Sequence, residues 1–155
     1  MSEMDSVPKN NRIEISIKGL TDEEREEVAQ IFHDQEFDAE VFQYIEKSGL
    51  PEVYEVIKLI FTDFSLWGWL RDGLLWGAFT KSLTKLWDYL KKKKPDARIE
   101  RIIKYEKVTV VLPMDESDTK TMLEKLPEAL KDVEPKGSKM VWVSYEKGEI
   151  VVKEW

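Results

Sequence analysis

The sequence predicts an α+β protein, and three observations support that class. Short segments in the first and last thirds of the chain alternate apolar and polar residues, the pattern of half-buried strands. Between them, apolar residues recur at helical spacing and include four tryptophans. With 155 residues, of which 42% are hydrophobic, the chain can bury a core without cysteine, and it contains none. We therefore expect elements of a mixed or antiparallel sheet that flank a central, tryptophan-rich hydrophobic helical hairpin.

The first third is expected to fold as strand, helix and strand. In the segment 12–18 every second residue is isoleucine, so one face of a strand is apolar. Thr21 and Glu24 have the spacing of a capping box, which predicts a helix from there to about residue 34. The segment 37–47 alternates and is expected to be a second strand. Residues 1–10 are polar, lack the apolar segment of a secretory signal, and are expected to be a disordered tail.

The central third is expected to form two helices. Pro51 suits the first position of a helix, and the apolar residues from Val53 to Phe64 recur at helical spacing. Ser65 can cap a second helix, which the lysine run 91–94 and Pro95 end. The sequence thus predicts a helical hairpin over 51–94.

The last third is expected to add strands 98–105 and 107–112, a helix over 115–133 that Pro127 kinks or splits, and a hairpin of 139–145 with 149–155 around Lys147 and Gly148. The first strand of that hairpin is apolar on both faces, so we expect it to be central or covered. The predicted core comprises Ile13, Ile15, Ile17, Val28, Ile31, Phe32, Val110, Leu112, Met122, Leu126 and Trp142.

These elements are expected to form one α+β domain over 11–155. The alternative is two sub-lobes, 11–48 and 96–155, joined by the helical hairpin 51–94. The sequence leaves both arrangements open, because strand order does not follow from periodicity.

The net charge of −7 is unevenly distributed. Residues 1–52 carry 5 basic and 14 acidic side chains, whereas residues 53–94 carry 8 basic and 4 acidic ones. An acidic first third disfavours nucleic acid, whose phosphates require a basic surface. It suits a basic protein partner, although acidic surfaces also serve solubility alone.

Three tryptophans of the central segment predict a binding surface. Trp67, Trp69 and Trp76 would point in different directions on one continuous helix, because successive residues are about 100° apart. We expect at least one of these rings to be exposed and to bind a protein partner or a second copy, with Lys81 and Lys85 on the rim. The competing interpretation is that the rings are core packing.

A membrane surface is the second candidate ligand of this segment. No run of about 20 uncharged apolar residues exists, so no spanning helix is expected. The helix 65–94 could instead lie in the membrane interface, where tryptophan is favoured and lysines meet anionic headgroups. The residues concerned are Trp87, Lys91, Lys92, Lys93 and Lys94.

No catalytic, cofactor-binding or metal-binding motif is recognisable. His33 is the only histidine, and its neighbour Asp34 would not face it on a helix. The acidic segment 115–118 lacks the spacing and the glycine of a calcium loop and suits a helix start. We expect no cofactor and no metal. Catalysis by carboxylates far apart in sequence stays open.

The order of the expected elements resembles that of a known family. A strand–helix unit is followed by a hydrophobic helical pair, an aromatic and leucine-rich stretch that ends in a basic run, here Leu86–Pro95, and short strands, here Ile99–Leu112. Over residues 12–112 this order resembles the effector-associated constant component of bacterial conflict systems. The central helices here carry more charge and tryptophan, and 115–155 adds a helix and a hairpin. The resemblance implies a non-enzymatic accessory protein that couples a partner to a trigger.

The sequence therefore predicts a cytoplasmic, acidic protein–protein interaction module that is not an enzyme, either an accessory subunit or an inhibitor in a bacterial conflict or defence system. A peripheral membrane protein acting through the helix 65–94 is the first alternative. A carboxylate-dependent hydrolase is the second.

Overall fold

The computed structural model describes residues 11–43, 56–62, 64, 66–131 and 140–154. This part of the chain is an α+β structure with one seven-stranded mixed sheet and four helices. The strands are β1 (Arg12–Lys18), β2 (Asp38–Gln43), β3 (Val56–Thr62), β4 (Arg98–Tyr105), β5 (Val108–Val111), β6 (Val141–Glu146) and β7 (Glu149–Glu154). The helices are α1 (Asp22–His33), α2 (Leu66–Arg71), α3 (Gly73–Lys93) and α4 (Glu116–Leu130).

The sheet consists of three parallel strand pairs and a final hairpin strand. Its order is β2-β1-β3-β4-β5-β6-β7. The pairs β1–β2, β3–β4 and β5–β6 are parallel, and each is connected through helix, whereas β1–β3, β4–β5 and β6–β7 are antiparallel. Strands from the first and last thirds of the chain therefore lie in one sheet.

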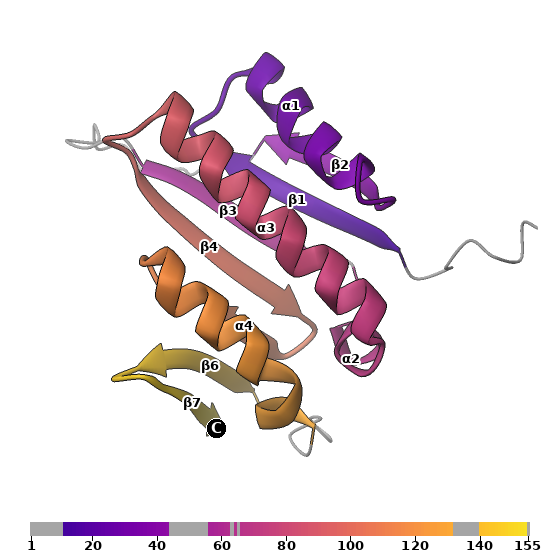
Figure 1. The fold of residues 1–155 in the computed structure, drawn as a ribbon, viewed down its shortest axis with the longest axis vertical. Helices are drawn as coiled ribbons and strands as arrows, with labels where there is room; N and C mark the ends of the chain where they lie inside the picture. The colour runs from indigo at the N-terminus through magenta and orange to yellow at the C-terminus, as the bar shows by residue number, and fades with distance from the viewer. Residues whose placement is uncertain (1–10, 44–55, 63, 65, 132–139, 155) are drawn as a thin grey trace, which may run out of the picture.

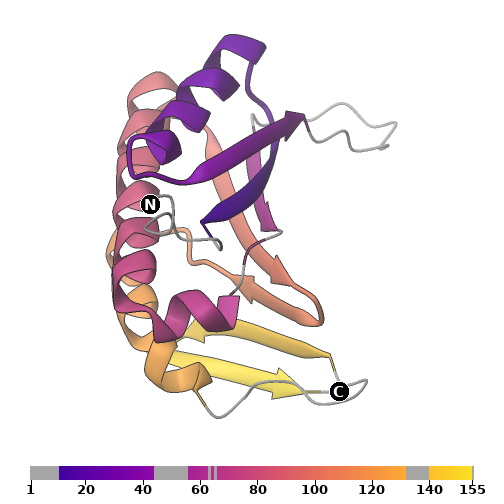
Figure 2. The ribbon, with the colours of Figure 1, turned by 90° about the vertical axis from the view of Figure 1, so that its right-hand side faces the viewer.

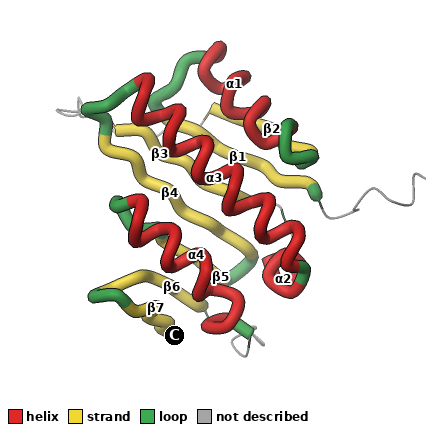
Figure 3. Tube along the Cα trace, in the orientation of Figure 1, coloured by secondary structure: helices red, strands yellow, loops and turns green. Residues whose placement is uncertain are grey.

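The helices form one layer on one face of the sheet, as the views in Figures 2 and 3 show. In that layer α3 packs between α1 and α4, while α1 packs on β2 and α4 on β7. The core lies between the layers, where alternate residues of the strands, such as Ile15, Leu59 and Ile103, are fully buried. This one-sided burial explains the strict alternation in the strands.

The three helix-connected pairs do not share one hand. With all helices on the same face, the steps from β1 to β2 and from β3 to β4 are right-handed crossovers (Figure 1). Strand β5 runs in the same direction as β1, but β6 lies on the opposite side of β5 from the side of β1 on which β2 lies. The β5–α4–β6 crossover is therefore left-handed. Almost all such crossovers in proteins are right-handed.

No described helix lies on the second face of the sheet. A row of paired positions crosses this face from Phe42 through Ser16, Ile60 and Ile102 to Val111. Phe42 is exposed, and the three aliphatic residues of the row are partly exposed. Charged side chains flank the row, and Arg12 bridges to Glu14 and Glu40 across two strands.

The predicted helix over 51–64 is wrong where the structure describes it, because Val56–Thr62 is strand β3. Its burial alternates with period two, with Ile57, Leu59 and Phe61 inward. A short apolar run fits both periodicities, and here β-branched and aromatic residues and the central position in the sheet favour the strand. Residues 51–55 lie outside the described part of the chain.

The second predicted helix is two helices, so the predicted hairpin over 51–94 is wrong. Helix α2 ends at Arg71, and Asp72 adopts an extended conformation with φ −92° and ψ 99°. Its carboxylate accepts hydrogen bonds from the backbone N–H groups of Leu74 and Leu75, at 2.9 and 3.2 Å. Asp72 is therefore the N-cap of α3. The cap predicted at Ser65 lies outside the described residues.

Most other elements confirm the sequence analysis. The capping box of α1 is formed by Thr21 and Glu24, and the last hairpin turns at Lys147 and Gly148, both with positive φ. Helix α4 continues through Pro127 as one helix, so the predicted split there is wrong. Of the predicted core, Ile31 is only partly buried and Trp142 is 40% exposed, so Trp142 is a wrong assignment. Its strand β6 has β5 and β7 on either side, but Trp142 points to the second face.

The predicted second strand is confirmed over Asp38–Gln43, and residues 44–47 lie outside the described part. Also outside it are the predicted tail 1–10, the end of the helix prediction at 132–133, and the terminal positions 139 and 155 of the predicted hairpin.

Candidate functional site

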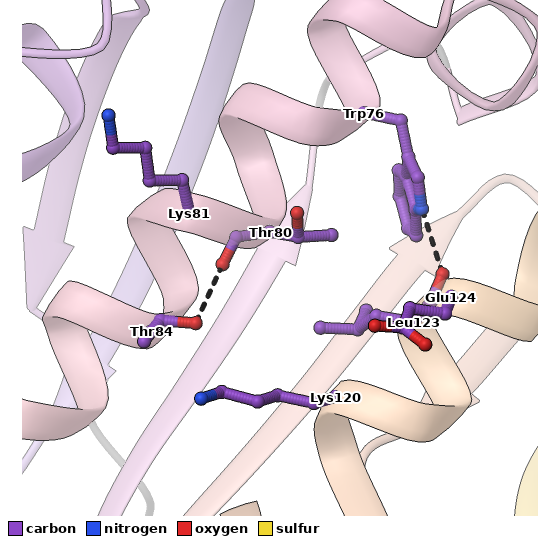
Figure 4. Close-up of a pocket in the computed structure, with 7 residues that line it drawn as sticks. All are labelled: Trp76, Thr80, Lys81, Thr84, Lys120, Leu123 and Glu124. Carbon is purple, nitrogen blue, oxygen red and sulfur yellow. Dashed lines mark hydrogen bonds between the residues drawn. The ribbon is translucent and has the colours of Figure 1, made fainter.

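A groove between α3 and α4 is the candidate binding site. It has a volume of about 270 Å³ and opens on the helix layer. Figure 4 shows side chains from both helices around it. They are Trp76, Thr80, Lys81 and Thr84 from α3 and Lys120, Leu123 and Glu124 from α4.

The α3 wall of the groove follows from helical spacing. Trp76, Thr80 and Thr84 are four residues apart and so lie on one face of the helix. The hydroxyls of Thr80 and Thr84 donate to the carbonyls of Gly77 and Thr80, at 2.9 and 3.2 Å. Because their donors are used within the helix, this wall is less polar than its sequence indicates.

One direct bond joins the two walls. The indole N–H of Trp76 donates to the carbonyl of Leu123 at 2.9 Å (Figure 4), and this contact is buried. In a regular helix that carbonyl would accept from residue 127, but Pro127 has no backbone N–H. Trp76 therefore supplies the donor that α4 lacks, and the bond closes one end of the groove.

Beneath the helix layer, an arginine lies among the core residues. Arg101 of β4 is 2% exposed and points to the helix side of the sheet. Its guanidinium carbon is 4.4 Å from the centroid of the Trp87 ring. One terminal nitrogen donates to the carbonyl of Pro113 at 2.8 Å and to the hydroxyl of Thr119 at 2.9 Å, whereas Nε is buried without a partner.

Burial sets the electrostatics of Arg101. Desolvation lowers the pKa of its guanidinium to about 10, and the negative charge of Glu116 opposes that shift. The cation–π contact with Trp87 and two carbonyl or hydroxyl acceptors stabilise the charge only in part. Arg101 thus connects α3, through Trp87, with the start of α4, through Thr119.

The expectation that at least one of Trp67, Trp69 and Trp76 is exposed is wrong. Their exposed fractions are 9%, 0% and 6%. The break at Asp72 places the first two rings on a separate short helix, so the three no longer fan out from one axis. Trp69 packs against Phe37, Phe64 and Phe79, and Trp76 also packs against Phe79. The competing core interpretation holds for these rings.

The lysines predicted for the rim are on the surface. Lys81 and Lys85 are exposed on α3, and Lys81 lines the groove with the buried Trp76. The groove therefore brings together two of the five predicted partner-binding residues. Trp67 and Trp69 do not line it, and both are buried in the core.

Four of the five residues of the membrane-surface alternative contact other side chains of this protein. Trp87 is partly buried, and both Arg101 and Lys91 lie over its ring. Lys93 lies over the Tyr89 ring, and Lys94 is 3.9 Å from the carboxylate of Glu24. Lys91, Lys92 and Lys93 are exposed at the end of α3. Within the described residues, no helix is long and apolar enough to cross a membrane.

Sequence reasoning missed Arg101, although a signal existed. Ile99, Arg101 and Ile103 share one face of the alternating strand 98–105, so an inward charge could be read from the spacing. Lys120, Leu123 and Glu124 carried no such signal, because the pairing of α3 with α4 depends on the fold.

His33 and Asp115, which were considered as catalytic or metal-binding residues, have structural roles. His33 lies with Nε2 3.1 Å from the Ala39 carbonyl, which ties the end of α1 to β2. Asp115 caps α4 by accepting from the N–H of Asp118 at 3.0 Å. Among the described residues, no group of three or more His, Asp or Glu side chains could hold a metal ion. Comparisons with protein-family models, curated proteins and solved structures find no match.

Proposed function

We propose that this chain is a non-enzymatic protein–protein interaction module whose α3–α4 groove takes an acidic, apolar segment of a partner protein. The single observation that supports this function is the composition of the groove. An apolar end, formed by Trp76 and Leu123, lies next to two lysines on opposite walls, Lys81 and Lys120.

Such a groove favours an apolar side chain beside a carboxylate. The apolar group would be removed from water against the indole and the leucine, which gains about 25 cal/mol for each Å² buried. A neighbouring carboxylate could then pair with Lys120 or Lys81, and Glu124 would repel a second acidic group at the Trp76 end. One residue of the partner would fill the groove, as the hot-spot residues of protein interfaces fill pockets.

In the cell, the module would act as an accessory subunit or an inhibitor, in the cytoplasm and in a bacterial conflict or defence system. That role follows the resemblance of residues 12–112 and the absence of a recognisable catalytic motif. It requires that the partner be a protein whose activity or assembly changes on binding.

The experiment is site-specific photo-crosslinking in cells of the source organism. A photoreactive residue replaces Thr80, inside the groove, and in a second protein replaces Lys104, which is exposed on the other face of the sheet. We expect one partner to be crosslinked from position 80 and not from position 104. The double substitution Lys81→Glu and Lys120→Glu should weaken that crosslink, and Lys104→Glu should not.

Two results would contradict the proposal. Equal crosslinking from both positions would place the partner elsewhere. A product that contains lipid or a small metabolite in place of a protein would assign the groove to another class of ligand.

A further inference from the structure

In the part of the chain that the structure describes, β7 is an edge strand, so one side of its backbone has no strand partner. The hairpin of β6 and β7 has a two-residue turn, Lys147 and Gly148, and pairs Glu146 with Glu149. In a hairpin of this type the residues that flank the turn form a hydrogen-bonded pair. Residues 149, 151 and 153 therefore bond to β6. The N–H and C=O groups of Ile150, Val152 and Glu154 point away from the sheet.

This pattern allows antiparallel pairing with a second β7 only in certain registers. Residues that face each other must both point their backbone groups toward the partner, or both away. Pairing about a two-fold axis at Val151 meets this condition. Ile150 of each copy then lies opposite Val152 of the other, so the two-fold axis relates two equivalent hydrogen-bonded pairs.

The same register is complementary in charge. With Val151 on the axis, Glu149 of each copy faces Lys153 of the other, so two ion pairs form on the second face of the sheet. A shift of the axis to Val152 would instead place Lys153 against Val151. The opposite edge strand, β2, contains Asp38 and Glu40 and no cation, so it has no such self-complementary register.

The surroundings of β7 fit a second copy as well. On the helix side, Ala129 and Ile150 line a shallow groove between α4 and β7, together with Glu124, Lys125 and Glu128 of α4 and with Glu149 beside the hairpin turn. Ile150, Val151 and Val152 are all partly exposed in the single chain. Pairing would cover this apolar edge, which natural proteins otherwise protect.

We propose that two copies of this chain associate through antiparallel pairing of β7 with β7, with Val151 on the two-fold axis, to form one continuous fourteen-stranded sheet. This surface is separate from the α3–α4 groove, and the proposal does not depend on the function of that groove.

A charge-exchange experiment tests the register. In a dimer of the Glu149→Lys variant, a lysine at 149 would face the lysine at 153 of the other copy. In a dimer of the Lys153→Glu variant, two glutamates would face each other. We expect each variant alone to self-associate about tenfold more weakly than the wild type in sedimentation velocity at low salt. An equimolar mixture of the two should recover the dimer, because each remaining lysine then faces a glutamate. Lys104→Glu, on β4 and outside both this edge and the α3–α4 groove, is the control and should dimerise as the wild type does.

Amide hydrogen exchange provides a second readout that needs no substitution. On dimerisation the N–H groups of Ile150 and Val152 should become protected, while that of Val151, already bonded to β6, should change little. A wild-type chain that stays monomeric at about 100 μM, far above the concentrations at which specific dimers form, would overturn the proposal. So would a dimer in which the Ile150 and Val152 amides stay unprotected, or a mixture of the two variants that fails to associate.

Discussion

The indole N–H of Trp76 on α3 binds the one carbonyl of α4 that Pro127 leaves without its helical donor. The bond from Trp76 Nε1 to Leu123 O is 2.9 Å long and buried. It explains how α4 keeps a proline in its fourth turn without leaving a carbonyl unpaired. Trp76 and Leu123 are 47 positions apart. The bond therefore couples the two helices through a carbonyl without its helical donor in α4 and an indole donor in α3.

This relationship predicts non-additive stabilities. Trp76→Phe should cost about 1–3 kcal/mol in urea denaturation, because the buried Leu123 carbonyl loses its donor. In a Pro127→Ala background, the new backbone N–H can serve that carbonyl, so the same Trp76→Phe change should cost less. Equal costs in the two backgrounds would show that the bond contributes nothing to stability.

The buried Arg101 predicts opposite effects for two substitutions. Arg101→Met keeps most of the volume beside Trp87 and removes the cost of burying a charge, so the unfolding free energy should stay the same or rise by about 1–4 kcal/mol. Arg101→Ala leaves a cavity and should destabilise by about 2–5 kcal/mol. Chemical denaturation of both variants checks this. A Met variant as unstable as the Ala variant would mean that the charged contacts themselves stabilise the fold.

Two glycines should respond to alanine with opposite signs. Gly19 has φ +97°, and an added Cβ would lie 2.6 Å from the backbone carbonyl oxygen of Val56. Gly19→Ala should therefore cost about 2 kcal/mol or more, from the left-handed conformation and the overlap together. Gly77 lies on the exposed side of α3 with nothing within 4 Å, so Gly77→Ala should stabilise by about 1 kcal/mol. Thermal unfolding of both variants gives the signs, and a stabilising Gly19→Ala would refute the close approach.

The capping box of α1 predicts a dependence on pH. The pKa of Glu24 is lowered mainly by the hydrogen bond from the Thr21 backbone N–H, and also by the charge of Lys94, while burial opposes the shift. A lowered pKa means that the ionised carboxylate stabilises the folded state above its unfolded pKa of 4.5. That contribution is lost as the pH falls through the folded pKa.

Glu24→Gln isolates this charge. The variant should be less stable than the wild type near pH 7, and the difference should shrink toward zero as the pH falls below 4.5 into the range where Glu24 itself becomes protonated. Urea midpoints measured at several pH values provide the comparison. A difference that persists unchanged at the lowest pH would assign the effect to side-chain geometry and not to charge.

The sequence predicted the elements whose signals are local. The capping box at Thr21 and Glu24, the alternation in 12–18 and the turn at Lys147 and Gly148 depend on neighbouring residues, and all three are confirmed. The run from Val56 to Phe61 was misassigned because its apolar positions match both periodicities, and only its place between β1 and β4 decides between them. The break at Asp72 was missed because apolar residues continue on both sides of it.

The candidate site was less predictable, because it depends on which helices become neighbours. Trp76 and Lys81 were identified for their residue types, but the expected exposure of the tryptophans required one continuous helix. Lys120 and Leu123 reach the groove from a helix about 40 residues away, and periodicity carries no information on that pairing. Arg101 was missed although its position was predictable, because alternation places it on the same inward face of β4 as Ile99 and Ile103.

The left-handed connection from β5 through α4 to β6 decides which side of the sheet stays open. With the same two strands, a right-handed connection would carry α4 across to the side opposite α1 and α3. Because α4 joins them instead, all the described helix ends, and with them the partial charges of the helix dipoles, belong to one side of the molecule. In the described residues, the other side presents strand side chains alone. Any molecule that binds this side must contact side chains from segments as distant in the chain as Phe42 and Val111.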